Sequence, residues 1–83
     1  MTAYPNPMMN TNTLKFRVDN SAVVSILIFD NNGRVVKSLL NEKKNTGDYV
    51  INWNASELVS GTYFVRAIQN DKVMQTLTLV KNN

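Results

Sequence analysis

The sequence contains no cysteine and no histidine among its 83 residues, and only three glycines and two prolines. Without cysteine, the chain has neither disulfides nor thiolate metal ligands. Without histidine, it lacks the usual general base near neutral pH, and no serine has a histidine to activate it. The three glycines are far apart, so no glycine-rich phosphate-binding loop is present. Composition therefore argues against an enzyme, and we expect no catalytic residue, no cofactor and no bound metal.

Charge is also sparse. Charged residues make up 18% of the chain, and nine Lys and Arg against six Asp and Glu give a net charge of +3. The basic residues are dispersed, and only Lys43-Lys44 is a doublet. No stripe of basic residues is interleaved with aromatic ones, as a nucleic-acid-binding surface would require. We therefore expect no nucleic-acid partner and interpret the charges as a source of solubility.

Long hydrophobic runs are missing as well. The longest ones, Val23–Phe29 and Leu77–Val80, fall far short of the roughly 20 residues that span a bilayer. The N-terminus lacks the basic and apolar regions of a signal peptide. We therefore expect no membrane span and place any export signal upstream of this chain.

What the sequence does contain is apolar residues at every second position. Leu14, Phe16 and Val18, for example, alternate with polar residues, which predicts a strand with one buried and one exposed face. Ala22–Phe29 is apolar almost throughout and predicts a central strand covered on both faces. The six predicted strands are Thr13–Val18, Ala22–Phe29, Arg34–Leu40, Asp48–Trp53, Thr62–Ile68 and Val73–Lys81.

Turn-forming residues separate these strands. Asn31-Asn32-Gly33 predicts a tight hairpin because asparagine and glycine tolerate positive φ, and Asn70-Asp71 predicts the last turn. Glu42–Gly47 is expected to form a longer polar loop whose glycine suits a left-handed position. Ala3–Thr11, with two prolines, is expected to be an extended lead-in or an edge strand broken by proline. Short strands at this spacing predict an all-β fold, an antiparallel β-sandwich.

Two features offer other functions. An exposed aromatic surface for stacking on sugars could be formed by Trp53, Tyr49 and Tyr63. However, Trp53 and Tyr49 lie on the same face of their predicted strand, which favours a buried aromatic cluster. Asp30-Asn31-Asn32-Gly33 begins like a calcium loop. Its glycine comes too early, however, and no glutamate stands at the twelfth position, so we expect no metal there.

Five short motifs occur in a definite order: Tyr4-Pro5-Asn6-Pro7, Ile28–Asp30 with Gly33–Val36, Gly47-x-Tyr49-x-Ile51-x-Trp53, Leu58–Arg66, and Leu77-x-Leu79-Val80-Lys81. In this order and spacing they resemble the C-terminal sorting domain of type IX secretion system cargo proteins (the type A, or Por secretion system, class). The resemblance runs from Tyr4 to Lys81. The chain departs from the family at Met8, where a Phe or another bulky residue is common, and methionine fills a similar apolar pocket.

The resemblance implies a non-catalytic sorting signal that directs the secretion of an attached cargo protein. It implies an Ig-like β-sandwich of six to seven strands, a single domain over residues 1–83, with residues 1–12 as an extended lead-in or edge segment. The implied partners are the outer-membrane type IX translocon with its shuttle components, and a sortase-type signal peptidase that removes the domain. The implied destination is the cell surface or the exterior, reached through the periplasm. An exposed edge strand would also allow a strand-mediated homodimer.

The family's motifs fall on these residues of the chain: Tyr4, Pro5, Asn6, Pro7, Asp30, Gly33, Arg34, Gly61, Tyr63, Leu77, Leu79, Val80 and Lys81. One interpretation is that they shape the fold, so that the translocon reads a folded surface. Another is that a few, Arg34 and Lys81 above all, contact the receptor directly, or that the last strand pairs with it by edge addition. We expect Asp30 and Arg34 to clasp the base of their turn. The alternative function is a carbohydrate-binding or adhesive module of a surface protein.

Overall fold

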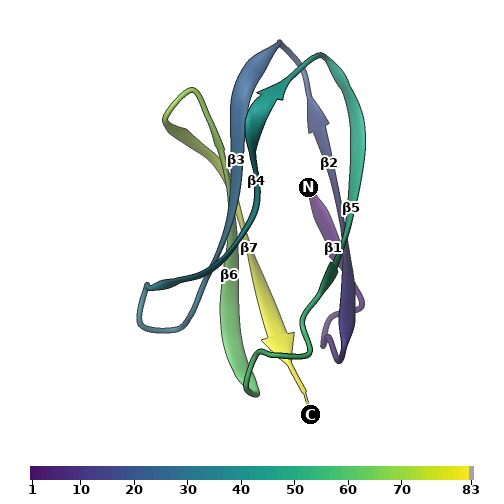
Figure 1. Cartoon of the computed structure of the whole chain (residues 1–83), viewed down its shortest axis with the longest axis vertical. Helices are drawn as coiled ribbons and strands as arrows, with labels where there is room; N and C mark the ends of the chain where they lie inside the picture. Colours follow the sequence, from purple (N-terminus) through teal and green to yellow (C-terminus); the bar gives the residue numbers. More distant parts are fainter. Residues whose placement is uncertain (83) are drawn as a thin grey trace.

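The computed structural model describes residues 1–82 as two antiparallel β-sheets packed face to face, with seven strands and no helix (Figure 1). One sheet has the order β1-β2-β5 and contains β1 (Thr2–Tyr4), β2 (Thr11–Val18) and β5 (Gly47–Asn54). The other has the order β4-β3-β6-β7 and contains β3 (Ala22–Phe29), β4 (Val35–Lys44), β6 (Gly61–Gln69) and β7 (Lys72–Lys81). The predicted all-β sandwich is confirmed, while the predicted domain boundary at residue 83 lies outside the described residues. Nowhere in residues 1–82 is there a helix long and apolar enough to cross a membrane.

The core lies between the two sheets and follows the alternation in the sequence. The inward residues of β2, β3 and β6 are buried, and the residues between them are more exposed. Met8 reaches the core from the loop between β1 and β2 and is fully buried, so the expectation that methionine fills an apolar pocket there is confirmed. The buried apolar residues are Met8, Leu14, Phe16, Val18, Ala22, Val24, Ile26, Ile28, Trp53, Ala55, Tyr63, Val65, Ala67 and Leu79.

Strand β3 is central in its sheet, but the prediction that both its faces are covered is wrong. Val24, Ile26 and Ile28 face the core, whereas Val23 on the other face is 51% exposed. A sandwich of two layers buries only the inner face of each sheet. The apolar run in the sequence therefore reflects the preference of β-branched residues for a strand as well as burial.

The predicted loop over Glu42–Gly47 is also wrong. β4 continues through Glu42 to Lys44, because Val24 pairs with Glu42 and Ala22 with Lys44. Only Asn45 and Thr46 separate β4 from β5, and Gly47 does not have a positive φ. The edge of β3 offers backbone partners along its whole length, and this pairing outweighs the polar composition of the segment.

Both predicted hairpins are present. In the first, the Asp30 carbonyl accepts a hydrogen bond from the Gly33 amide at 3.0 Å, and Gly33 takes a φ of 85°. This is a three-residue loop with a left-handed glycine, and only Gly33, not Asn32, needs positive φ. In the second, Asn70 and Asp71 both have positive φ, which is the two-residue turn that fits the twist of a hairpin.

The first half of β7 departs from the predicted alternation. Leu77 and Leu79 face inward as expected, but Val73 is 55% exposed. The pairing register shifts between Ala67 and Ile68 because β7 carries one extra residue there, Met74, so that Val73 lies opposite the outward-facing Ile68. One extra residue in a ladder moves the following side chains to the other face.

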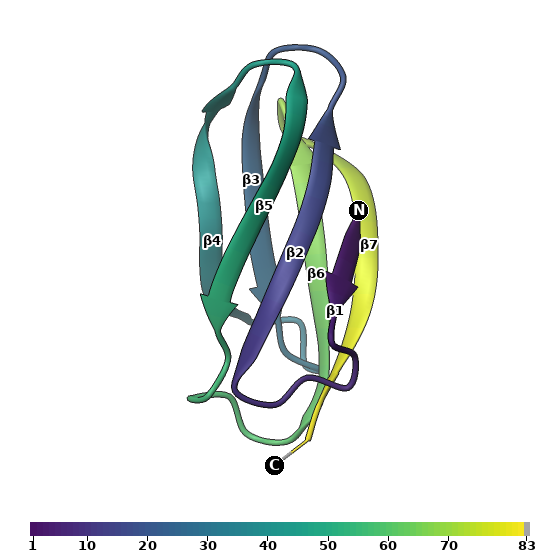
Figure 2. The same ribbon diagram turned by 90° about the vertical axis from the view of Figure 1, so that its right-hand side faces the viewer.

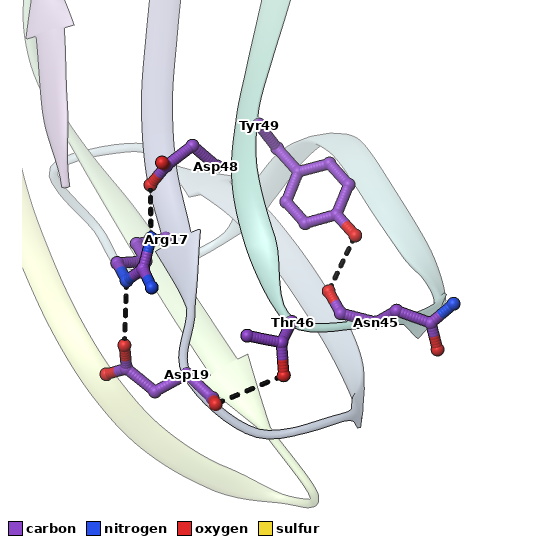
Figure 3. A network of polar contacts seen from close by, with 6 residues as sticks. All are labelled: Arg17, Asp19, Asn45, Thr46, Asp48 and Tyr49. Atoms are coloured by element: carbon purple, nitrogen blue, oxygen red, sulfur yellow. Dashed lines mark hydrogen bonds and ion pairs between the residues drawn. The ribbon is translucent and has the colours of Figure 1, made fainter.

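Polar contacts connect the loop between β2 and β3 with the loop between β4 and β5, at the upper end of the sandwich in Figure 1, as the close-up in Figure 3 shows. Arg17 binds Asp19 and Asp48, each at 3.0 Å, and the Thr46 hydroxyl donates to the Asp19 carbonyl at 3.2 Å. The hydrogen bond to Asp48, followed by the other contacts with the two carboxylates, raises the pKa of Arg17. These side chains are exposed, so the contacts orient the loops more than they stabilise the fold.

Candidate functional site

Most of the candidate motif residues lie at one end of the sandwich, the lower end in Figures 1 and 2. Strands β1, β3, β5 and β7 finish at this end, and β2, β4 and β6 start there. We call it the motif end and define it as Tyr4–Pro7, Asp30–Arg34, Gly61–Tyr63 and Leu79–Lys81. Of the candidate residues, Leu77 lies farther along β7. The up-and-down connectivity therefore brings together motifs that are distant in the sequence.

The Pro5-Asn6-Pro7 loop is fastened to the outer edge of β7. The Asn6 side chain donates to the Thr78 carbonyl and accepts from the Val80 amide, both at 3.0 Å. The loop then continues the pairing, because the Met8 amide donates to the Val80 carbonyl at 2.7 Å and the Met8 carbonyl accepts from the Asn82 amide at 2.9 Å. An asparagine side chain here takes the place of a strand neighbour.

This arrangement limits where the last strand can accept a partner strand. The edge of β7 from Thr78 onward is occupied by Asn6 and Met8. Along β7, it is the part before Thr78 whose outer edge has no paired strand among residues 1–82. Since unpaired edges promote association with other chains, the loop protects the half of β7 that carries the motif.

A second asparagine, Asn12, joins the loop to the core. Its side chain donates to the Pro5 carbonyl at 2.9 Å and accepts from the Trp53 indole at 3.2 Å. Asn12 is 1% exposed and Trp53 is 7% exposed. Trp53 therefore belongs to the core, as expected, and is not available for stacking on a sugar. Our sequence reasoning missed Asn12, although a polar residue in phase with the buried Leu14 would have indicated it.

Asp30 organises the turn between β3 and β4. Its carboxylate accepts from the backbone amides of Asn32 and Arg34 at 2.9 and 3.0 Å, and from the Arg34 Nε at 3.2 Å. These bonds, that of the Arg34 amide foremost, lower the pKa of Asp30. The predicted clasp is confirmed. The Arg34 side chain remains 79% exposed and projects from the motif end.

β6 begins at Gly61, and its Tyr63 makes a hydrogen bond of a kind that Tyr49 makes at the start of β5. The buried Tyr63 donates its hydroxyl to the Val59 carbonyl at 2.7 Å, four residues upstream. At the start of β5, Tyr49 donates in the same way to Asn45 at 2.6 Å (Figure 3). Such a tyrosine corner fixes a loop to the strand that follows it. Gly61 has a φ of 151°, so its backbone conformation, not lack of space, favours glycine there.

A groove of about 380 Å³ separates two of these segments at the motif end. It is lined by Asp30–Asn32 and Arg34 on one side and by Val59–Tyr63 on the other. Val59 is 74% exposed at its rim, whereas the neighbouring Leu58 packs against the core. An exposed valine beside an exposed arginine gives this surface both apolar and charged character.

Burial divides the candidate residues into three groups. Tyr63, Leu79 and Lys81 are buried, Lys81 to 2% exposure, so Arg34 is the accessible member of the pair expected to contact a receptor. Asp30 and Leu77 are half-buried. The exposed candidates are Tyr4, Pro5, Asn6, Pro7, Gly33, Arg34, Gly61 and Val80. Over residues 1–82, no three acidic side chains gather as a metal-binding group.

The sequence from residue 2 to residue 82 matches the secretion system C-terminal sorting domain family (Por_Secre_tail). Among solved structures, a similar fold occurs in PorZ of Porphyromonas gingivalis, an essential bacterial surface component of the type IX secretion system. The two share 20% identity with a TM-score of 0.69 over 99% of this chain, which spans 11% of the PorZ chain. No curated protein sequence matches this chain. The match over nearly the whole length shows that the chain belongs to the family of secretion system C-terminal sorting domains.

Proposed function

We propose that the secretion machinery recognises this chain through the folded surface at the motif end. The family consists of C-terminal sorting signals for type IX secretion, and this chain is such a signal. A sorting signal carries no chemistry of its own, so its function depends on the surface that it presents. The observation that supports the motif end is the gathering of most of the candidate residues there.

Some of these residues hold the loops in place and others are exposed, which supports recognition of a folded surface rather than of a linear peptide. Tyr63 and Leu79 are in the core, and Asn6 is engaged with β7. These residues hold the loops of the motif end in place. Tyr4 and Arg34 are exposed beside them and are free to touch a partner.

The proposed partners are the outer-membrane translocon with its shuttle components, and a sortase-type peptidase that cleaves on the N-terminal side of the domain. The proposed route passes through the periplasm and ends at the cell surface or the exterior. We further propose that the domain has no enzymatic activity and that residues 1–83 act as one unit at the C-terminus of a cargo. The family supports each of these proposals, because its members are C-terminal sorting signals.

The test is an export assay in cells with a type IX system. Residues 1–83 are fused to the C-terminus of a periplasmic reporter, and the surface fraction is compared among the wild type, Arg34→Ala and Arg66→Ala. Arg66 is an exposed arginine within β6 that does not belong to the residues defining the motif end, and its guanidinium lies over the Phe29 ring at 4.8 Å. The matched pair therefore separates loss of a positive charge from loss of the motif surface.

We expect the wild type and Arg66→Ala to reach the surface and Arg34→Ala to accumulate in the periplasm, with all three domains folded. Retention of the wild-type fusion would refute the sorting function of this chain. Equal export of the two variants would leave the sorting function in place and refute recognition through Arg34 at the motif end.

A further inference from the structure

The three-stranded sheet is incomplete beside β1. β2 pairs with β5 along its whole length, from Thr11 to Val18, but β1 covers only Thr13–Lys15 on the other side. Among the described residues, no strand lies next to Phe16–Val18 on that side. Figure 2 shows the short β1 beginning, at the N-terminus, midway along its longer neighbours β2 and β7. The backbone of β2 thus keeps a free edge of three residues.

A largely apolar pocket opens between the sheets beside this free edge. It measures about 270 Å³. Its apolar lining comes from Met1, Phe16, Val24, Ala67 and Met74, and its polar lining from Arg17, Asp19, Gln69 and Gln75. Met74 is 59% exposed there. The Met1 amino group donates to the Gln75 side chain of β7 at 2.9 Å, so the N-terminus lies at the mouth of the pocket. A free strand edge next to an uncovered apolar pocket is the arrangement that an added strand would complete.

We propose that the residues immediately preceding Met1 in a secreted cargo continue β1 along Phe16–Val18 and place one apolar side chain over this pocket. The proposal rests on the sorting function, in which the cargo is joined to the N-terminal side of the domain. Because Thr2 pairs with Lys15, antiparallel pairing sets the first upstream residue opposite Arg17 and the second opposite Val18.

The strand pattern also assigns the chemistry of these two upstream residues. Met1 and Ala3 pack against the core, whereas Thr2 and Tyr4 are exposed. Continuing this alternation points the first upstream residue outward, toward Arg17, and the second inward over the pocket. The first is therefore expected to be polar and the second apolar.

The length of the free edge favours a tethered segment over a separate molecule. Three residues offer only a few backbone hydrogen bonds, too few to compensate the freedom that a separate peptide would lose on binding. A segment attached to Met1 is already held beside the edge at high effective concentration. The same reasoning makes a second copy of this chain the weaker occupant.

The experiment compares residues 1–83 alone with two extended forms, in which Ser-Val-Thr or Ser-Thr-Val precedes Met1. The two extensions have the same composition, but only the first places valine inward. We expect Ser-Val-Thr to slow the hydrogen exchange of the edge amides of Phe16–Val18 about tenfold or more and to raise the Tm by about 4 °C, with little effect from Ser-Thr-Val. Equal exchange and equal Tm for the two extended forms would overturn the proposal. Protection that grows with protein concentration would also overturn it, because the edge would then be filled by a second copy.

A variant of the pocket provides an internal control. Met74→Gln is expected to leave the Tm of the unextended chain nearly unchanged, since Met74 is largely exposed, and to remove most of the difference between the extensions. A difference that survives this substitution would contradict burial of the valine in the pocket. Export of a cargo fused through either extension would leave the sorting function intact, so the two proposals fail separately.

Discussion

Replacing Asn6 with alanine tests whether the loop between β1 and β2 protects the edge of β7. The substitution removes both hydrogen bonds of the Asn6 side chain, to Thr78 and Val80, each 3.0 Å long. A net contribution of about 0.5–1.5 kcal/mol per bond, at an exposed site, gives a loss of about 1–2 kcal/mol in the free energy of unfolding. For a domain of this size, each kcal/mol lowers the Tm by about 4–8 °C.

The matched control is Asn10→Ala, which makes the same change in the same loop. Asn10 is exposed, and its side chain makes no hydrogen bond in the described structure. Unfolding by heat and by urea should show the loss for Asn6→Ala and a change within about 0.5 kcal/mol for Asn10→Ala. Hydrogen exchange of the Val80 amide should accelerate only in Asn6→Ala. Equal stabilities, or an unchanged Val80 exchange rate, would refute the reasoning.

Three further outcomes are expected. Because the Arg34 amide above all lowers the pKa of Asp30, the ionised carboxylate stabilises the fold above its ordinary pKa of 3.8, and this stabilisation is lost as the pH falls through the lowered value of the folded state. Urea unfolding of Asp30→Asn should therefore depend less on pH below about pH 4. Tyr63→Phe should lower the free energy of unfolding by about 1 kcal/mol in thermal melts, because it removes one hydrogen bond. Asn12→Ala should lower the free energy of unfolding by about 2–3 kcal/mol, because it leaves the buried indole N–H of Trp53 without an acceptor. Urea unfolding followed by Trp53 fluorescence measures this loss.

The chain supplies controls for these variants. Tyr4→Phe removes a hydroxyl from an exposed tyrosine, and Asn10→Ala again changes an exposed asparagine whose side chain makes no hydrogen bond in the described structure. Neither should shift the free energy of unfolding by more than about 0.5 kcal/mol. The tyrosine corner would be unsupported if Tyr63→Phe matched Tyr4→Phe. The buried polar link would be unsupported if Asn12→Ala matched Asn10→Ala. If the free energy of unfolding of Asp30→Asn changed with pH in parallel with that of the wild type, the ionised Asp30 carboxylate would not be the group that stabilises the fold.

Local alternation was sufficient to predict the faces of β2, β5 and β6. Over the predicted strands Thr13–Val18, Asp48–Trp53 and Thr62–Ile68, the inward positions carry apolar or aromatic residues, and the outward ones include Lys15, Val50 and Arg66. The extension of β4 to Lys44 was not predictable in this way, because it depends on the partner edge that β3 supplies. The exposure of Val73 depends on the extra residue that β7 carries opposite Ala67 and Ile68, and this register is set by the pairing of β6 with β7 and not by the residues of β7 alone.

For the candidate site as well, contacts between residues close in the sequence were predictable and contacts between distant residues were not. The Asp30 clasp is formed within five residues of sequence, and the residue types in its turn were enough to predict it. The contact of Asn6 with Thr78 joins residues 72 positions apart, and no local pattern encodes it. The resemblance to a family pointed to both residues, but only the folded structure shows that Asn6 binds the edge of the last strand.

This long-range contact bears on what a receptor at the motif end would distinguish. The hydrogen bonds of Asn6 and Met8 with β7 form only when the first and last segments of the chain are both present and folded together. A chain that ends before Thr78 would lose the partners of both residues, and the Pro5-Asn6-Pro7 loop would no longer be held at the motif end. A receptor that recognises this end would therefore distinguish complete, folded domains from truncated ones, which a receptor for a short linear signal would not do.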